Sequence, residues 1–284
     1  MKFDIIIGNP PYQTKRKEEF KKSQPIWPGF VELSCELTKK NGYTCLIHPS
    51  GWRNAGGMFE KTKELLLSGD MIYLEIHDVN DGLKTFGACT RYDWYVRKNA
   101  AYSITTETKD QHGITSIINL SEYEIIPSSN FDDVKRFFAV DGEDRVEVVH
   151  SGSAYMTCRK YMSREKTDEF CYPCSYFTRK NGTFSLFYSN TNQNGHFGIP
   201  KVIFSNGRCG IPIVDATGEY GATQFSYFIV DEVKNLGLIQ KAMDSDRFIK
   251  IMADCSVGGC NKYNKRAISL LRKDFWKEFL EEQQ

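Results

Sequence analysis

The chain lacks the features that mark several large classes of protein. Its longest apolar run is far too short to span a bilayer, and no charged and then apolar leader precedes residue 4. Lysine and arginine number 37 against 36 aspartate and glutamate, so the charge excess of a nucleic-acid coat protein is missing. There is no internal repeat and no low-complexity tract. We therefore expect a soluble, cytoplasmic globular protein without a membrane partner, and a DNA enzyme stays open if its positive charge gathers in one cleft.

The nine cysteines do not form the pattern of a disulfide framework. Only Cys171 and Cys174 have the tight spacing of a metal-binding pair, and no second pair of that spacing accompanies them. A structural zinc ion normally takes four ligands. Because the chain shows no secretory leader, the cysteines are expected to be ordinary reduced thiols, with a structural zinc site as the alternative.

The stretch Phe3–Tyr12 has the most informative pattern in the chain. The branched apolar run Ile5–Ile7 predicts a strand buried on both faces, as inside a parallel sheet. The run stops at Gly8, and Asn-Pro-Pro-Tyr follows. Consecutive prolines fix the backbone, so we expect Asn9 to be held rigidly at the carboxyl end of a strand. In open α/β sheets ligands bind at that edge.

The residue types in this loop suit the recognition of an exocyclic amine. The side-chain carbonyl of Asn9 and the backbone carbonyl of Pro10 can accept both amine hydrogens, and the prolines add no competing N–H donor. Tyr12 offers a flat face on which a base can stack. Together they suit an adenine extruded from a duplex. The alternative is a rigid turn with a packed tyrosine.

Asn9, Pro10, Pro11 and Tyr12 after a buried strand resemble motif IV of the amino-group DNA methyltransferases, in particular the N6-adenine methylases of type II restriction-modification systems. The resemblance implies that these four are the catalytic residues, that Asn9 and Pro10 hold the adenine N6, and that Tyr12 stacks on the flipped ring. It also implies S-adenosylmethionine as the methyl donor and double-stranded DNA as the substrate.

The next segments extend this resemblance to about residue 98. A strand, a helix and a strand in succession predict a parallel crossover, and the last strand is expected to be antiparallel, as in the second half of the methyltransferase sheet. Helices are predicted at Pro28–Lys40, ended by Asn41-Gly42, and at Phe59–Leu67. Strands are predicted at Tyr43–His48, Met71–His77 and Thr90–Arg97, and a loop is predicted at Asp78–Thr85.

Composition divides the chain into three predicted regions. Residues 1–98 would be the catalytic half of the methyltransferase domain, residues 99–198 a variable α+β insertion, and residues 199–284 a target-recognition-like region with C-terminal helices. The predicted fold class is therefore α/β, with the catalytic half of a Rossmann-like methyltransferase sheet plus an α+β target-recognition region. Aromatic and basic residues interleave in a way that suits DNA, although surface composition alone explains much of it: Arg159, Lys160, Tyr161, Arg164, Tyr176, Phe177, Arg179 and Lys180.

Several side chains are candidates for contact with DNA. A polar, basic loop directly after Tyr12 contains residues that can reach phosphates, unless the loop is simply solvated. A second loop follows Pro49, and its Trp is as well explained by packing. His48 and His77 are expected to make structural contacts. The candidates for DNA contact are Lys15, Arg16, Lys17, Trp52, Arg53 and Lys201.

A cofactor-binding half is missing from the pattern. Such a half would have a strand, a glycine-rich turn and an acidic residue after the next strand. Only eight residues precede Asn9, and none of the glycine pairs near residues 207–210, 218–221 and 258–259 both follows a strand and opens a helix. Without that half, the Asp4–Ile7 strand becomes an apolar sheet edge, which natural proteins avoid. We expect a separate chain to cover it, or a second copy of this chain, or elements from residues 100–198.

Two functions follow from these observations. The first is a site-specific DNA adenine-N6 methyltransferase, or its catalytic and recognition subunit, that needs a partner for the cofactor half. The second is a non-catalytic DNA-binding specificity or regulatory subunit of a restriction-modification system. A restriction nuclease is less well supported, because no clear Pro-Asp…Asp/Glu-x-Lys arrangement lies in a strand context.

Overall fold

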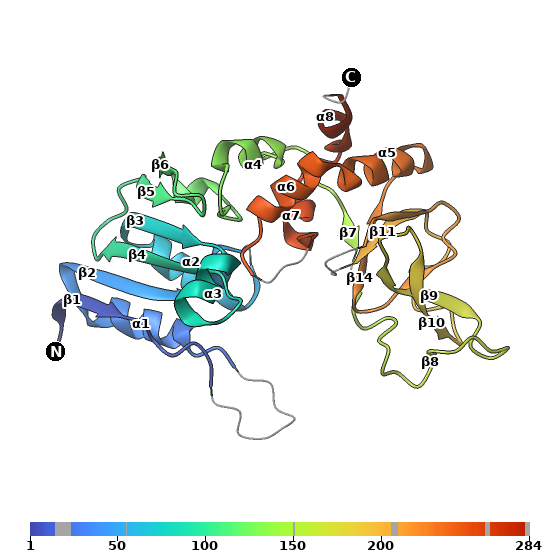
Figure 1. Cartoon of the computed structure of the whole chain (residues 1–284), viewed down its shortest axis with the longest axis horizontal. Helices are drawn as coiled ribbons and strands as arrows, with labels where there is room; N and C mark the ends of the chain where they lie inside the picture. Colours follow the sequence, from blue (N-terminus) through green and yellow to red (C-terminus); the bar gives the residue numbers. More distant parts are fainter. Residues whose placement is uncertain (15–23, 55, 150, 206–209, 259–261, 282–284) are drawn as a thin grey trace. The chain divides into compact units, whose positions relative to one another are not determined.

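The computed structural model describes residues 1–14, 24–54, 56–149, 151–205, 210–258 and 262–281. Within these residues the protein is a mixed α/β protein that forms two compact units (Figure 1). The first unit comprises Met1–Phe131 with Cys255–Gly259, and the second comprises Asp132–Asp254 with Cys260–Gln284. No helix in the described part of the chain combines the length and the apolar character that a membrane span requires.

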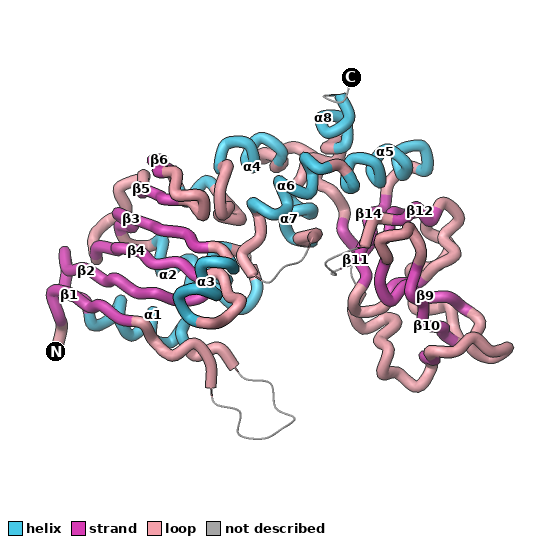
Figure 2. The backbone as a smooth tube through the Cα atoms, viewed as in Figure 1, coloured by secondary structure: helices cyan, strands magenta, loops and turns pink. Residues whose placement is uncertain are grey.

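The first unit is built on a six-stranded sheet with the order β1-β2-β4-β3-β5-β6 (Figure 2). β1 and β2 are parallel, which confirms the predicted crossover, and β4 runs antiparallel to both β2 and β3, as predicted. The carboxyl ends of β1, β2 and β3 therefore lie at the same edge of the sheet. The strands are β1 Phe3–Gly8, β2 Thr38–Pro49, β3 Asp70–His77, β4 Tyr92–Lys98, β5 Thr106–Lys109 and β6 Thr115–Ile118.

Two helices, α1 and α2, share one hydrophobic core with this sheet. The buried residues Trp27 and Val31 of α1 and Leu66 of α2 belong to the same cluster as Leu74 and Tyr95 of the strands. Burial of each such side chain contributes about 1.5–3 kcal/mol. The helical segments of the first unit are α1 Trp27–Leu37, η1 Ser50–Arg53, η2 Gly57–Phe59, α2 Glu60–Leu67, α3 Val79–Phe86 and η3 Leu120–Glu122.

The first predicted helix ends three residues earlier than expected. The backbone is already extended at Thr38, where β2 begins. Asn41, with φ of 63°, and Gly42 lie inside β2 and do not terminate the helix. An added Cβ at Gly42 would come 2.7 Å from the carbonyl oxygen of Asp4, so glycine permits the close approach of β1 at an irregularity in the pairing.

The predicted loop at Asp78–Thr85 is wrong, because Val79–Phe86 form the helix α3. Asp78 caps the helix by accepting a hydrogen bond from the backbone N–H of Asp81 at 2.8 Å, and Gly87, with φ of 66°, ends it in the left-handed conformation. Gly82 has low helix propensity, but an added Cβ there would overlap the carbonyl oxygen of Thr90. Close packing against Thr90 therefore explains a glycine inside this helix.

β1 is not buried on both faces, which corrects the prediction for Ile5–Ile7. β2 is its only partner among the described strands, and Ile5 and Ile7 are 61% and 76% exposed. The predicted apolar edge therefore lies open in the described part of the chain. β5 and β6, which come from the region expected to cover it, extend the opposite edge of the sheet.

The second unit contains two four-stranded sheets and all the C-terminal helices that the structure describes. Hydrogen bonds between hydroxyl groups join the sheets, one between Ser175 and Ser226 and one between Thr178 and Ser205, each at 3.0 Å. The sheet orders are β13-β9-β10-β8 and β12-β11-β14-β7. The strands are β7 Val148–Val149, β8 Met162–Ser163, β9 Tyr172–Thr178, β10 Phe184–Ser189, β11 Lys201–Ser205, β12 Ile213–Asp215, β13 Gly221–Ala222 and β14 Ser226–Val230; the helices are α4 Phe131–Phe137, α5 Val233–Asp244, α6 Asp246–Asp254, α7 Lys265–Leu270 and α8 Trp276–Glu281.

The compact units do not follow the predicted regional boundaries after residues 98 and 198. β5 and β6 lie beyond residue 98 but continue the first sheet. β7, from the predicted insertion, pairs with β14 of the predicted target-recognition region. The separation between the units falls after Phe131, and a short return segment at Cys255–Gly259 belongs to the first unit.

Candidate functional site

The loop after β1 lies at the sheet edge where three parallel strands end: β1 at Gly8, β2 at Pro49 and β3 at His77. Asn9 is exposed, and its side chain makes no hydrogen bond with any residue that the structure describes. Pro10, directly after it, is buried. A buried proline with a fixed φ anchors the loop, and the carboxamide of Asn9 stays available to a ligand.

The Tyr12 ring is held in place by its surroundings. It is partly buried against the core of the first unit and meets the ring of Phe86, the last residue of α3, edge-on at 6.2 Å. Burial raises the pKa of Tyr12. The backbone carbonyl of Tyr12 accepts a hydrogen bond from Ile26 at 3.1 Å, which closes the base of the following loop. Tyr12 can therefore present its ring to a base without first being ordered.

Contacts behind Phe86 fix its position in turn. Phe86 packs edge-on against Tyr92 at 4.9 Å, and His77 stacks on Tyr92 at 4.3 Å. The Tyr92 hydroxyl donates to Asp81, and His77 Nδ1 lies 2.8 Å from Asp81. Burial, together with the Asp81 carboxylate, raises the pKa of Tyr92 to about 12. His77 thus makes structural contacts, as predicted, and supports the ring that meets Tyr12.

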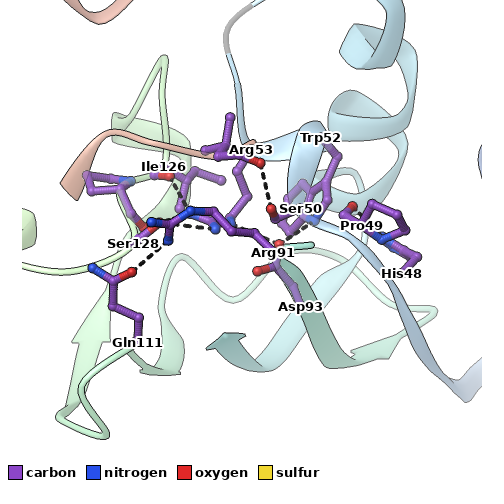
Figure 3. A network of polar contacts seen from close by, with 12 residues as sticks. His48, Pro49, Ser50, Trp52, Arg53, Arg91, Asp93, Gln111, Ile126 and Ser128 are labelled. Carbon is purple, nitrogen blue, oxygen red and sulfur yellow. Dashed lines mark hydrogen bonds and ion pairs between the residues drawn. The ribbon is translucent and has the colours of Figure 1, made fainter. Parts of the chain in front are cut away.

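Trp52 and Arg53 do not have the role that the sequence suggested. Both side chains are fully buried, so neither is accessible to DNA in this structure. The Trp52 indole and the Arg53 guanidinium both donate to Oδ2 of Asp93, at 2.9 and 2.8 Å (Figure 3). Burial raises the pKa of Asp93, and the adjacent Arg53 opposes that rise. The two residues therefore hold the loop after β2, at the same sheet edge as Asn9.

The Arg53 guanidinium also joins segments that are far apart in the sequence. It donates to the carbonyl oxygens of Ile126 and Pro127 at 2.9 and 3.0 Å (Figure 3). The Ser128 hydroxyl in turn donates to the carbonyl of Ser256 at 2.9 Å. The last residues before the chain leaves the first unit and the return segment thus share one polar network, which stabilises this edge of the sheet.

Lys201 is likewise a structural residue and not a DNA contact. Its side chain is fully buried, with Nζ 2.8 Å from Asp215, and it donates to the carbonyl oxygens of His196 and Ile199. Burial lowers the pKa of Lys201, and the Asp215 carboxylate opposes that shift. The remaining predicted DNA contacts, Lys15, Arg16 and Lys17, lie outside the described residues.

Of the three glycine pairs considered as a turn for the methyl donor, the structure describes one in full. Gly218, with φ of 74°, lies between β12 and β13, and Gly221 begins β13, so this pair opens no helix. The other two glycine pairs fall partly outside the described residues.

The predicted metal-type cysteine pair has no further ligands in the described ranges. Cys171 is exposed and Cys174 buried, and no three His, Cys, Asp or Glu side chains in these ranges gather as a metal site requires.

Asp93 is the residue of this edge that the sequence reasoning missed. Asp93, Tyr95 and Arg97 alternate along β4, and all three are buried. The period of two was visible in the sequence and places these side chains on one face. If Tyr95 is taken to face the core, the same pattern predicts that Asp93 and Arg97 also face inward. Two buried charges need partners.

Residues 1–86 match the model of the Eco57I restriction-modification methylase family. This match contains the Asn9–Tyr12 loop and the first three long strands of the sheet up to the end of α3. The matched segment is thus similar to a restriction-modification methylase domain. No protein of curated function matched the chain.

Solved structures of restriction-modification enzymes show weak similarity. The type IIL enzyme MmeI in complex with DNA is 9% identical with a TM-score of 0.46, covering 94% of this chain and 45% of that chain. The type IIG restriction endonuclease BpuSI is 10% identical with a TM-score of 0.40, covering 97% and 48%. A structure of a type I restriction-modification system is 13% identical with a TM-score of 0.32, covering 48% and 29%. This chain spans less than half the length of each, and TM-scores below 0.5 do not establish a shared fold.

Proposed function

We propose that this chain is the catalytic and DNA-recognition part of a site-specific DNA adenine-N6 methyltransferase of a restriction-modification system. The observation that carries the proposal is the Asn9–Tyr12 loop at the carboxyl end of β1, with Asn9 exposed and the Tyr12 ring fixed by Phe86. The match of residues 1–86 to a methylase family supports it. The first sheet would then be the catalytic half of a Rossmann-like methyltransferase sheet.

Asn9 and Pro10 act on the attacking amine. The N6 lone pair of adenine is delocalised into the ring and is a poor nucleophile. The side-chain oxygen of Asn9 and the backbone carbonyl of Pro10 accept the two N6 hydrogens, which draws electron density back onto the nitrogen. Acceptors placed where positive charge develops stabilise the transition state. The proton leaves during or after methyl transfer, so no strong general base is required.

Tyr12 holds the flipped base in place. Extruding a base costs a few kcal/mol, and stacking on an aromatic ring returns roughly 1–3 kcal/mol per base. Because Phe86 and the backbone bond to Ile26 already fix Tyr12, little further ordering is needed on binding. Pro11 keeps the loop rigid between the amine acceptors and the stacking ring.

S-adenosylmethionine would supply the methyl group, and chain segments beyond this sequence would bind it. The Gly218–Gly221 pair opens no helix, and the edge of β1 along Asp4–Ile7 has no further strand beside it among the described residues and exposes Ile5 and Ile7. Unpaired edges of this kind attract another strand. We propose that the cofactor-binding half pairs with this edge, from a separate chain or from another part of the same polypeptide.

The second candidate is a non-catalytic DNA-binding specificity or regulatory subunit. The sequence has no glycine-rich turn that both follows a strand and opens a helix, which favours this candidate for the chain by itself. The Asn9 carboxamide, which no described residue binds, favours the enzyme, because a subunit that only binds DNA needs no group that grips an amine. The two candidates predict different results for a substitution of Asn9. In the enzyme it slows methyl transfer, whereas in a binding subunit it has no effect on methyl transfer.

The test is methyl transfer to DNA by this chain together with the cofactor-binding segment that the proposal requires, to be sought in the neighbouring reading frames and measured as N6-methyladenine by mass spectrometry of nucleosides. Asn9→Ala should lower the rate at least about 100-fold, the range for loss of one transition-state hydrogen-bonding group, while DNA binding persists. Asn80→Ala, an exposed asparagine at the same sheet edge, is the matched control and should keep full activity. Unchanged methylation in Asn9→Ala would remove Asn9 from the mechanism.

Calorimetry addresses the divided cofactor site separately. The chain alone should bind S-adenosylmethionine weakly or not at all, and addition of the cofactor-binding segment should restore binding. Micromolar affinity of the isolated chain for S-adenosylmethionine would contradict a divided site while leaving the amine clamp intact.

A further inference from the structure

Four aromatic rings gather on the second unit, and two of them are exposed. They are Tyr176 and Phe177 of β9, Phe187 of β10, and Phe225, which precedes β14; we call them the aromatic patch. The Tyr176 ring lies 5.0 to 5.1 Å from each of the other three. Phe177 and Phe225 are 38% and 43% exposed. Surface phenylalanines scattered singly need no explanation, whereas neighbouring exposed rings make this cluster a candidate interaction site.

A β-bulge brings the two neighbouring rings of β9 together. Ser185 pairs with Phe177 and Leu186 pairs with Ser175, so Tyr176 is the extra residue of the bulged strand. In a regular strand, successive side chains point to opposite faces. The bulge breaks that alternation and lets the rings of Tyr176 and Phe177 lie 5.1 Å apart. Bulges that redirect a side chain are frequent next to functional sites.

Phe225 is exposed but its backbone is held firmly. The side chain of the preceding Gln224 accepts a hydrogen bond from the Thr157 N–H at 3.1 Å and donates to the Thr157 hydroxyl at 2.8 Å. On the other side, the Ser226 hydroxyl bonds Ser175 of β9. An exposed aromatic ring on a fixed backbone loses little entropy when it binds, which is the property of an interface anchor.

The charge around the patch favours a polyanionic partner. The Arg164 guanidinium lies over the Phe187 ring at 5.7 Å and is exposed. The segment 157–187, which contains three of the four rings, has six basic and three acidic residues, a net charge of +3 against +1 for the whole chain. Aromatic rings that stack on bases, together with cations that neutralise phosphates, are the combination that nucleic-acid-binding surfaces use.

We propose that the aromatic patch, with Arg164 at its edge, is a DNA-contacting surface of the second unit, on which Phe177 and Phe225 lie against bases or deoxyriboses and Arg164 against a phosphate. The proposal rests on the proposed function, because it names the residues with which that DNA enzyme would grip its substrate. It places the DNA contact of the second unit on these exposed residues and not on Lys201, whose side chain is fully buried.

The test compares variants of the full chain in binding a labelled DNA duplex of mixed sequence by fluorescence anisotropy at several salt concentrations. Phe225→Leu keeps an apolar side chain but removes the flat ring, and it should weaken binding about 5- to 100-fold without changing the salt dependence. Arg164→Gln should lower the slope of log affinity against log salt by about one. Phe225→Trp should retain binding. Ile199→Ala, at an exposed apolar residue of the same unit, is the control and should bind as the unaltered chain does.

The outcomes separate this inference from the proposed function. If Phe225→Leu binds the duplex as tightly as the unaltered chain, or if Ile199→Ala weakens binding equally, the patch is not a DNA contact. If DNA binding is unchanged but the variant alters self-association in light scattering, the patch is a protein interface and the inference fails. If Phe225→Leu weakens DNA binding while Asn9→Ala leaves methylation intact, the patch stands and the proposed function falls. Absence of any DNA binding by the unaltered chain would overturn both.

Discussion

The two units each bury a basic side chain against a carboxylate, but they surround that carboxylate differently. In the first unit Arg53 lies 2.8 Å from Asp93, and in the second Lys201 lies 2.8 Å from Asp215, with both pairs out of contact with solvent. Asp93 Oδ1 has no hydrogen-bond partner among the described residues. Both oxygens of Asp215 accept backbone N–H bonds, from Glu219 and Tyr220.

This comparison shows what a buried ion pair contributes. Removing one partner of such a pair is costly mainly because the other charge stays buried without compensation. Asp93 depends on Arg53 and on one indole N–H, whereas Asp215 would retain two amide donors. Equal distances therefore do not imply equal effects of mutation.

The largest effect on stability is expected for Arg53→Met. Among the described residues it leaves Trp52 as the only donor to the buried Asp93, and it also releases the carbonyls of Ile126 and Pro127. We expect a loss of about 4–5 kcal/mol in the free energy of unfolding of the first unit, at the upper end for a broken buried pair. Urea unfolding followed by tryptophan fluorescence measures it, since three of the four tryptophans lie in the first unit. Recovery in Arg53→Met with Asp93→Leu is the control, and a loss below 1 kcal/mol would contradict the account.

Lys201→Met should cost less, about 3 kcal/mol, because the amides of Glu219 and Tyr220 still solvate Asp215. Hydrogen-exchange mass spectrometry of peptides covering β11 and β14 reports the second unit separately. Lys201→Met with Asp215→Leu is the matched double variant. If Lys201→Met proves more damaging than Arg53→Met, the backbone donors do not compensate and the contrast between the two pairs is lost.

A pH effect confined to the first unit is expected from His48. The ring is fully buried and stacks on Trp27 at 4.3 Å, and burial lowers the pKa of His48 to about 4. The unfolded chain takes up the proton near pH 6.5, so stability is complete above that pH and falls as the pH decreases toward 4. The total loss is about 3 kcal/mol.

His48→Phe keeps a flat ring beside Trp27 but cannot be protonated. The difference in unfolding free energy between the two proteins should therefore change between pH 6.5 and 4 and stay constant above that range. Hydrogen exchange should show the change in peptides of the first unit alone. A difference that is independent of pH would mean that His48 is not buried in its neutral form.

Local patterns predicted the strands and long helices well. The parallel pairing of β1 and β2 followed from a strand, a helix and a strand in sequence, and the predicted helix Phe59–Leu67 appears as Glu60–Leu67. α3 was predicted as a loop, although its capping residues Asp78 and Gly87 were visible in the sequence. Gly82 has low helix propensity, but in the structure it has a packing reason.

The partners of buried charges could not be predicted from local pattern. Arg53 and Asp93 are forty residues apart in sequence, and only the sheet brings them together. In the sequence, Arg53 and Lys201 are basic residues next to a predicted binding loop or recognition strand. A buried ion-pair partner and an exposed DNA contact cannot be distinguished by that position alone. The exposure of Ile5 and Ile7 was predicted only in part. The same apolar sequence suits a central strand and an edge strand, and only the neighbouring strands decide between them.

The most direct test of the central claim is the identity of the modified base. The chain, expressed with its neighbouring reading frames in a host free of DNA methylation, should produce N6-methyladenine in the host DNA, measured by mass spectrometry of nucleosides. Asn9→Ala should abolish the signal, and Asn80→Ala should leave it unchanged. Appearance of N4-methylcytosine instead, or N6-methyladenine that persists in Asn9→Ala, would contradict the account of Asn9–Tyr12 as an adenine clamp.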